Sequence, residues 1–334
     1  MKSIFMPDYY PEKVSVPHRK DSPTILFLGS GVGVYTLETL LEKGVDVGKV
    51  LSDKNDPVIK FARTNDIPFE VLTDKKSLDK SLADSGLEMG IKYMVVAFTD
   101  HVIPKNFTEK YFAKIIGVHA SNLPLYRGGY PIEAALLDGK KGTSIVTYLI
   151  NEGLDKGAVL RKASFSLTLP KIYVIDGNYI QHLYENAAIK AGELLAKTLF
   201  DYERINPREQ KRSEATYSHK PKKEDLTIDW QNHTREHVIN MMKAGGMVYT
   251  KYMGHDIIIC GLELVEAKVR ETSPGSITII TPDKDKERKI CITTKDGGVL
   301  GLNEVKFAEK QLQIINLNGY IHNNYLLEQK LKLG

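Results

Sequence analysis

The chain has few cysteines and no long apolar run. It has 334 residues and only two cysteines, Cys260 and Cys291, which cannot form a disulfide framework and lack the spacing of a zinc site. We expect two partly buried thiols in a reducing compartment. No apolar run approaches the ~20 residues that span a bilayer, and residues 1–20 lack the apolar core of a signal peptide. The expectation is a cytoplasmic protein without membrane contact.

An excess of charge of one sign is also missing. Lys and Arg number 46 against 42 Asp and Glu, a net charge of +4. A protein whose main task is to grip a phosphate backbone carries a larger basic surplus, so the charge argues against a nucleic-acid partner. Apolar residues make up 42% and charged residues 26%, as in ordinary globular proteins. At roughly 100–200 residues per domain, the length predicts two domains, or at most three.

The first part of the chain alternates between strand-like and helix-like segments. Residues 24–28 (TILFL) form a short apolar run, followed by a glycine turn and by apolar residues at helical spacing up to Gly44. Residues 93–98 and 115–118 have the continuous apolar character of buried strands. This alternation predicts an α/β domain with a Rossmann-like, mostly parallel sheet over residues 23–200, preceded by an extension over residues 1–22.

The second part of the chain has a different texture. Residues 179–200 form the longest helical pattern, and the polar residues 201–230 are expected to be a linker. Beyond them, short alternating segments are separated by turn signals such as Ser-Pro-Gly and Asp-Gly-Gly. This spacing predicts a smaller β-rich, OB-like domain over residues 231–334.

Two lesser patterns leave their function open. Gly29, Gly31 and Gly33 follow a strand and open a helix, but their spacing is GxGxG, and the third glycine of a dinucleotide fingerprint would fall on Val34. A tight strand-to-helix turn is the favoured interpretation, and a ligand phosphate at the helix N-terminus is the alternative. His233 and His237 lie four residues apart without an evident third ligand, so no metal site is predicted.

Residues 115–160 carry the chemistry. A buried strand ends at His119. Residues 120–129, rich in small and polar residues, Pro and Gly, follow as a loop at its carboxyl end, where ligands bind in open α/β sheets. Residues 151–157 (NEGLDKG) follow a second strand and present Asp155 between two glycines. On neighbouring strand-end loops the two can form an acid–base pair, in which the carboxylate fixes the tautomer of the imidazole. A structural histidine and a turn aspartate are the alternatives.

Two motifs in this segment match those of a known family. The first, Asn-x-His-x-Ser-Leu-Leu-Pro-x-x-Arg-Gly, is matched by His119, Ser121, Leu123, Pro124, Arg127 and Gly128. The second is intact as Gly153-Leu-Asp-Lys-Gly157. The chain from residue 24 onward thus resembles the folate-dependent formyltransferases. The resemblance implies N10-formyltetrahydrofolate as donor, no metal, and formyl transfer to an amine.

The resemblance also implies roles for individual residues. His119 would be the acid–base residue that contacts the developing oxyanion, and Asp155 would tune it. The folate would be held by the residues Val102, Ile103, Pro104, Ile150 and Asp155. The loop on the acceptor side would be shaped by Ser121, Arg127 and Gly128.

One departure from the motif concerns the catalytic Asn of the family, which falls on Gly117. An amide aimed at an oxyanion contributes on the order of 3–4 kcal/mol, and glycine has no side chain to replace it. Asn122, three residues after His119, is the candidate substitute, and capping of the loop backbone is its alternative role. A catalytically impaired relative that only binds folate or a nucleotide therefore stands as an alternative function.

A second departure concerns the acceptor. Methionyl-tRNA formyltransferases carry a long basic loop after the strand that here contains Val50, whereas residues 52–66 hold no such insertion. Together with the low net charge, this favours a small amine, above all a nucleotide-linked amino sugar. Methionyl-tRNA is the second alternative, and a homodimer stays open.

Overall fold

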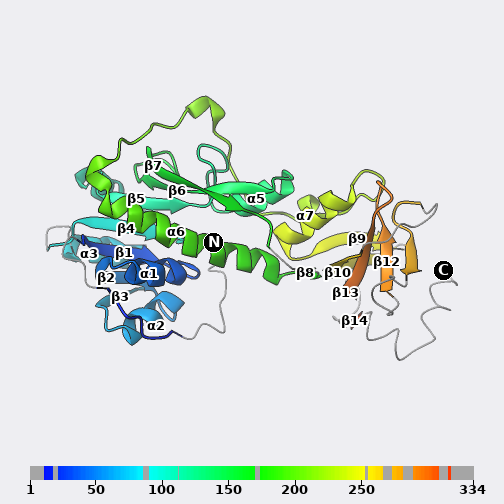
Figure 1. Cartoon of the computed structure of the whole chain (residues 1–334), viewed down its shortest axis with the longest axis horizontal. Helices are drawn as coiled ribbons and strands as arrows, with labels where there is room; N and C mark the ends of the chain where they lie inside the picture. The colour runs from blue at the N-terminus through cyan, green and yellow to red at the C-terminus, as the bar shows by residue number, and fades with distance from the viewer. Residues whose placement is uncertain are drawn as a thin grey trace. The chain divides into compact units, whose positions relative to one another are not determined.

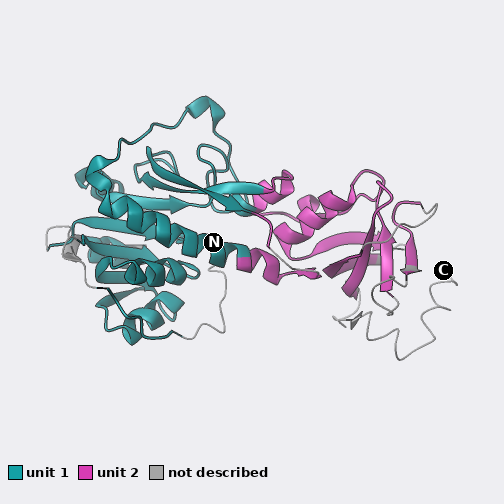
Figure 2. Ribbon diagram, in the orientation of Figure 1, with its two compact units in different colours: residues 1–132, 142–166, 183–219 teal, residues 133–141, 167–182, 220–334 magenta. Residues whose placement is uncertain are grey.

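The computed structural model describes residues 11–17, 22–85, 90–111, 113–169, 174–252, 255–265, 273–280, 289–307 and 315–316. Much of the expected N-terminal extension therefore lies outside the described residues. The chain divides into two compact units (Figure 2). Unit 1 comprises residues 1–132, 142–166 and 183–219, and unit 2 comprises residues 133–141, 167–182 and 220–334.

Unit 1 is built on a seven-stranded sheet (Figure 1). Its order is β3 (Phe69–Leu72), β2 (Asp46–Asp53), β1 (Thr24–Gly29), β4 (Tyr93–Ala97), β5 (Ile115–His119), β6 (Gly142–Leu149) and β7 (Val159–Ser166). The first five strands are parallel, and β6 and β7 are each antiparallel to their neighbours. The mostly parallel α/β sheet predicted from the sequence is confirmed.

Helices cover both faces of this sheet because successive strand residues point to opposite sides. On one face a core cluster joins β1 to helices α3 (Lys75–Ser85) and α4 (Lys105–Lys110) through Leu26, Leu28, Leu78, Leu82 and Phe107. On the other, α1 (Gly33–Glu42) contacts α2 (Pro57–Thr64). The hydroxyl of Thr36 in α1 also donates to the carbonyl of Ala188 in α6 (Asn178–Phe200), at 2.9 Å.

Unit 2 is an antiparallel, β-rich body, as the sequence predicted. Its strand order is β11 (Ile277–Ile280), β12 (Lys289–Thr293), β13 (Val299–Phe307), β10 (His255–Leu264) and β8 (Val174–Asp176). Strand β9 (Val248–Tyr252) also pairs with β10, and β14 (Ile315–Asn316) with β13. Helix α5 (Pro131–Leu137) lies largely in this unit, and α7 (Arg235–Gly245) begins after Thr234, whose side chain accepts from the amide of His237 and caps the helix.

The polar residues 201–230 contain three short 3₁₀ helices: η1 (Tyr202–Arg204), η2 (Arg212–Glu214) and η3 (Glu224–Leu226). The segment also makes single β-bridges, in which Arg208 pairs with Val159 and Tyr217 with Arg127. These bridges satisfy backbone groups that an extended polar segment would otherwise leave to water. They also hold residues 208–217 against the loops that carry the motifs.

The two cysteines are free and buried, and burial raises the pKa of the Cys291 thiol to about 12. Thiolates are the reactive form, so Cys291 stays an inert core residue at neutral pH. No helix among the described residues has the length and apolar character to cross a bilayer. In the same part of the chain, no three His, Cys, Asp or Glu side chains gather as metal ligands.

The loop between β6 and β7 closes tightly, and Gly157 is the reason. A Cβ built on Gly157 would lie 1.6 Å from the carbonyl oxygen of Leu149, a backbone atom that cannot move away. We predict that Gly157→Ala destabilises the protein by at least about 2 kcal/mol, the cost of overpacking. Gly129→Ala is the matched control, since no atom lies within 4 Å of a Cβ there. Thermal unfolding of the two variants measures the difference, and equal midpoints would contradict it.

Candidate active site

A cavity of about 750 Å³ lies at the carboxyl ends of β4 and β5. It is lined by Val96 and Phe98 from the end of β4 and by Val118, His119 and Ala120 from the end of β5. The sheet order reverses between β1 and β4, and ligands of open α/β sheets bind at the strand ends beside such a reversal. The volume is typical of a site for a small molecule or cofactor.

His119, the last residue of β5, is 7% exposed and has both ring nitrogens directed at oxygen atoms. Nε2 lies 2.8 Å from the carbonyl oxygen of Tyr126. Because a carbonyl only accepts, Nε2 carries the hydrogen in the neutral ring. Nδ1 faces Oδ2 of Asp155 at 3.7 Å, beyond hydrogen-bond length. Nδ1 is therefore the atom of the neutral ring that can take up a proton.

Asp155 is 9% exposed, and each of its carboxylate oxygens receives a hydrogen bond. The Tyr148 hydroxyl donates to Oδ1 at 2.6 Å, and the Gly128 amide donates to Oδ2 at 2.8 Å. Buried carboxylates are tolerated when they are bonded in this way. The two donors fix the plane of the carboxylate and turn Oδ2 toward His119.

The structure brings His119 and Asp155 together by a route that the sequence did not predict. Strand β6 is antiparallel to β5, and the amide of Ile150 donates to the carbonyl of Ile115 at the beginning of β5. The carboxyl end of β6 thus lies beside the beginning of β5, away from His119 at the end of β5. Residues 150–157 form the connection from β6 to β7 and turn back to present Asp155. His119 and Asp155 thus meet although β5 and β6 run in opposite directions.

Most of the other predicted cofactor residues line the same cavity. They are Val102, Ile103, Pro104 and Ile150, together with Gly128 from the predicted acceptor loop. Two apolar side chains of the lining stay unusually exposed, Val102 at 73% and Leu154 at 60%. Exposed apolar side chains that flank a cavity are typical of a surface covered by a ligand.

Three predicted residues, Ser121, Asn122 and Arg127, are not among the described residues that line this cavity. The side-chain oxygen of Asn122 accepts a hydrogen bond from Lys162. Ser121 donates to the carbonyl of Leu125 at 2.6 Å and closes the loop. Asn122 therefore does not bring an amide to the site in place of Gly117, and its side chain binds a lysine instead of capping the loop.

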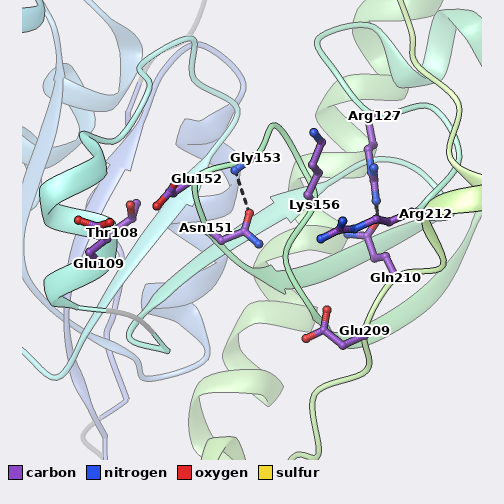
Figure 3. Close-up of a pocket in the computed structure, with 10 residues that line it drawn as sticks. All are labelled: Thr108, Glu109, Arg127, Asn151, Glu152, Gly153, Lys156, Glu209, Gln210 and Arg212. Atoms are coloured by element: carbon purple, nitrogen blue, oxygen red, sulfur yellow. Dashed lines mark hydrogen bonds between the residues drawn. The ribbon is translucent and has the colours of Figure 1, made fainter.

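Arg127 lines a second cavity, of about 440 Å³ (Figure 3), and residues 151–153 line both cavities. Arg127 is 2% exposed, and its guanidinium donates to the side-chain oxygen of Gln210 from Nε at 3.1 Å and from Nη2 at 2.7 Å. The Gln210 amide in turn donates to the carbonyls of Asp155 and Gly157, at 2.8 and 2.7 Å. Arg127 thus supports the loop that carries Asp155.

Sequence reasoning missed three residues of this arrangement: Tyr126, Tyr148 and Gln210. Tyr148 could have been suspected from the alternation of β6, which points it to the same side as Val146. No signal marked Gln210, because it lies in the polar segment 201–230 and far from the motifs in sequence. The carbonyl of Tyr126 acts through the backbone, which residue type does not reveal.

The glycine turn after β1 is closed by a side chain of the protein itself. Gly31 has φ +54°, and its amide donates to both carboxylate oxygens of Asp56, at 2.9 and 3.2 Å. Asp56 also accepts from the amide of Val58 at 2.9 Å and so caps α2. Burial raises the pKa of Asp56. The Asp56 carboxylate therefore satisfies the amide of Gly31 within the turn, which favours the tight-turn interpretation.

Two tyrosines near Asp155 and Arg127 have pKa values that are shifted in opposite directions. The pKa of Tyr217 is lowered because the Arg127 guanidinium donates to its hydroxyl and Lys156 adds positive charge. Burial and the charge of Asp155 raise the pKa of Tyr148 well above 10. We predict that Tyr217→Phe removes a tyrosinate that forms early in an alkaline ultraviolet titration, whereas Tyr148→Phe leaves that early part unchanged. The reverse pattern would contradict the assignment.

The chain is similar to known proteins over most of its length. Residues 25–171 match the family model Formyl transferase, and residues 220–320 match the model Formyl transferase, C-terminal domain. The methionyl-tRNA formyltransferase of Campylobacter lari is 30% identical over 324 residues, which cover 93% of this chain and 98% of that protein.

Solved structures share the fold at lower identity. HypX from Aquifex aeolicus has a TM-score of 0.58 and 16% identity over 92% of this chain and 49% of that one, so this chain spans about half its length. An N-formyltransferase from Helicobacter canadensis in complex with folinic acid and dTDP-3-aminofucose has a TM-score of 0.56 and 16% identity, covering 84% of this chain and 98% of that chain. Family models match both parts of the chain, and a relative is 30% identical over 93% of it. The chain therefore belongs to the formyl transferase family.

Proposed function

We propose that the protein transfers a formyl group from N10-formyltetrahydrofolate to an amine, and that His119 and Asp155 manage the proton in this reaction. The observation that carries the proposal is the pair itself. His119 and Asp155 line one cavity, with Nδ1 and Oδ2 3.7 Å apart. Hydrogen bonds of unliganded sites are often longer than in the substrate complex and shorten when substrate binds.

The cavity fits a reduced folate in size and chemistry. Its volume of about 750 Å³ is sufficient for a cofactor of drug-like size. The exposed side chains of Val102 and Leu154 offer apolar surface to a flat ring. The donor would supply a formyl group already bound to nitrogen, so the protein needs only to position the reactants and move a proton.

Formyl transfer takes one proton from the attacking amine and returns one to the nitrogen that gives up the formyl group. His119 takes up the first proton at Nδ1 and can deliver it as the second. The protonated ring is satisfied at both nitrogens, because Nε2 donates to the Tyr126 carbonyl and Nδ1 faces the Asp155 carboxylate. One residue can therefore act first as base and then as acid.

Two molecules are candidates for the formyl acceptor, and methionyl-tRNA is the better supported. The full-length relative at 30% identity is a methionyl-tRNA formyltransferase, which reverses the order that the sequence alone favoured. A cavity of about 560 Å³ in unit 2 offers support, since its lining has a cationic excess: Lys140, Lys141, Arg235 and Lys243 against Glu236 and Asp296. Cationic side chains of this kind contact phosphates in nucleic-acid complexes.

A nucleotide-linked amino sugar is the second candidate, and a specific observation favours it. Only residues 54–56 connect β2 to α2, where the resemblance places a long basic loop in the tRNA enzymes. The net charge of +4 also gives little long-range attraction for RNA.

The role of His119 gives the first test. We predict that His119→Ala lowers kcat about 10²- to 10⁴-fold, the range for loss of a general acid–base group. Release of tetrahydrofolate from N10-formyltetrahydrofolate in the presence of an acceptor measures the rate. His182→Ala is the matched control, because His182 is exposed and outside the described lining of the cavity. A His119→Ala enzyme as fast as the control would contradict the mechanism.

The acceptor is tested by offering both candidates to the same preparation. With methionyl-tRNA as substrate, we predict formyl-methionyl-tRNA as product and a KM that rises steeply with salt, because each phosphate contact releases a counterion. With a nucleotide-linked amino sugar, the KM should depend on salt only weakly. Turnover of the sugar alone would assign the second candidate. Binding of folate without turnover of either acceptor would identify an impaired relative and contradict the proposal.

A further inference from the structure

Gly117 and Tyr148 lie directly opposite each other in the β5–β6 ladder. Opposed residues of a strand pair share one face of the sheet. A Cβ built on Gly117 would lie 2.8 Å from Cε1 and from Cζ of Tyr148 and 3.0 Å from Cγ1 of Ile150. Real Cβ atoms do not approach other atoms so closely. The Tyr148 ring therefore fills the volume that any side chain at position 117 would need.

This placement of the ring carries its hydroxyl into the candidate active site. Tyr148 lines the cavity together with His119 and Asp155. Its hydroxyl donates to Oδ1 of Asp155 at 2.6 Å, while the Gly128 amide holds Oδ2. Without the hydroxyl, Oδ1 would lose a donor in a place where water has little access. The carboxylate could then turn about its Cβ–Cγ bond, and Oδ2 would no longer be held toward His119.

Tyr148 is chemically suited to this task at any working pH. It is 7% exposed, and burial together with the negative charge of Asp155 raises its pKa well above 10. The phenol is therefore neutral and keeps the hydrogen that it donates. Its bonded partner, Asp155, is a charged acceptor, and such charge-assisted bonds are short and strong.

We propose that Tyr148 is a positioning residue of the formyl-transfer site, which fills the space left open by Gly117 and holds Asp155 so that Oδ2 faces Nδ1 of His119. The inference rests on the proposed function and deepens it. It makes Gly117 and Tyr148 a matched pair, because only glycine at position 117 lets the ring reach Asp155.

Tyr148→Phe tests the hydrogen bond while keeping the ring over Gly117. We expect kcat to fall about 10- to 100-fold, as for a misplaced catalytic group, with the KM of donor and acceptor changed less than about twofold. Tyr202→Phe is the matched control, because its hydroxyl donates to the Ala113 carbonyl and Tyr202 is outside the described lining of the cavity. A Tyr148→Phe enzyme with the kcat of the control would overturn the proposal.

Gly117→Ala tests the pairing from the other side. The added methyl group forces the Tyr148 ring to move. Gly117→Ala should therefore lower kcat even though it removes no functional group. Because both changes break one hydrogen bond, Gly117→Ala/Tyr148→Phe should be no slower than the slower single variant. Multiplied losses in the double variant, with both single variants folded in thermal unfolding, would overturn the pairing.

A readout independent of turnover separates this inference from the proposed function. The ¹⁵N resonances of the His119 ring report the hydrogen bonds of its two nitrogens. We expect them to shift in Tyr148→Phe and to stay unchanged in Tyr202→Phe. Unchanged His119 resonances in Tyr148→Phe would overturn the positioning role, whether or not the enzyme turns over. If the wild-type protein formylates neither acceptor and the His119 resonances still shift in Tyr148→Phe, the positioning role is supported and only the proposed function is contradicted.

Discussion

The hydrogen bonding of the Asp155 carboxylate is the constraint on which the candidate site depends. A buried carboxylate must find donors, and Asp155 finds them in Tyr148 of β6 and in the Gly128 amide of the loop after β5. Its backbone carbonyl accepts a hydrogen bond from the side-chain amide of Gln210, and Arg127 orients that amide. Segments far apart in sequence therefore converge on one residue. His119 needs no direct bond to Asp155 in order to be held opposite it, because the carboxylate is fixed from the other sides.

The fold could be predicted from the sequence as far as local patterns reach. The apolar run before Gly29, the continuous apolar strands around Val95 and Ile116, and the helical spacing of α6 gave the alternating α/β order. The turn signals in the second half gave the antiparallel β-rich unit. Local residue patterns predicted a mostly parallel sheet but did not assign a direction to β6. The strand direction decides where the loop after Leu149 begins, so the route by which Asp155 reaches His119 is visible only in the structure.

The candidate site, too, could be predicted from the sequence only in part. His119 and Asp155 stand in motifs that can be read as residue types, and the structure brings them to one cavity. Asn122 shows the limit of such reasoning, since proximity in sequence to His119 did not predict that its side chain would bind Lys162. Tyr148 and Gln210 act through pairings across strands and segments. A sequence specifies such pairings only through the whole fold, so no local pattern could have identified them.

The Asp56 carboxylate in the glycine turn has a consequence for how this fold could acquire new ligands. One side chain both caps α2 and satisfies the amide of Gly31. A nucleotide phosphate could enter the turn only by displacing this carboxylate, which would leave the helix without its cap. The turn thus already holds an acceptor from the protein itself, and an incoming anion would have to compete with it. Recruitment of a dinucleotide would require a new cap for the helix before any change in the glycines.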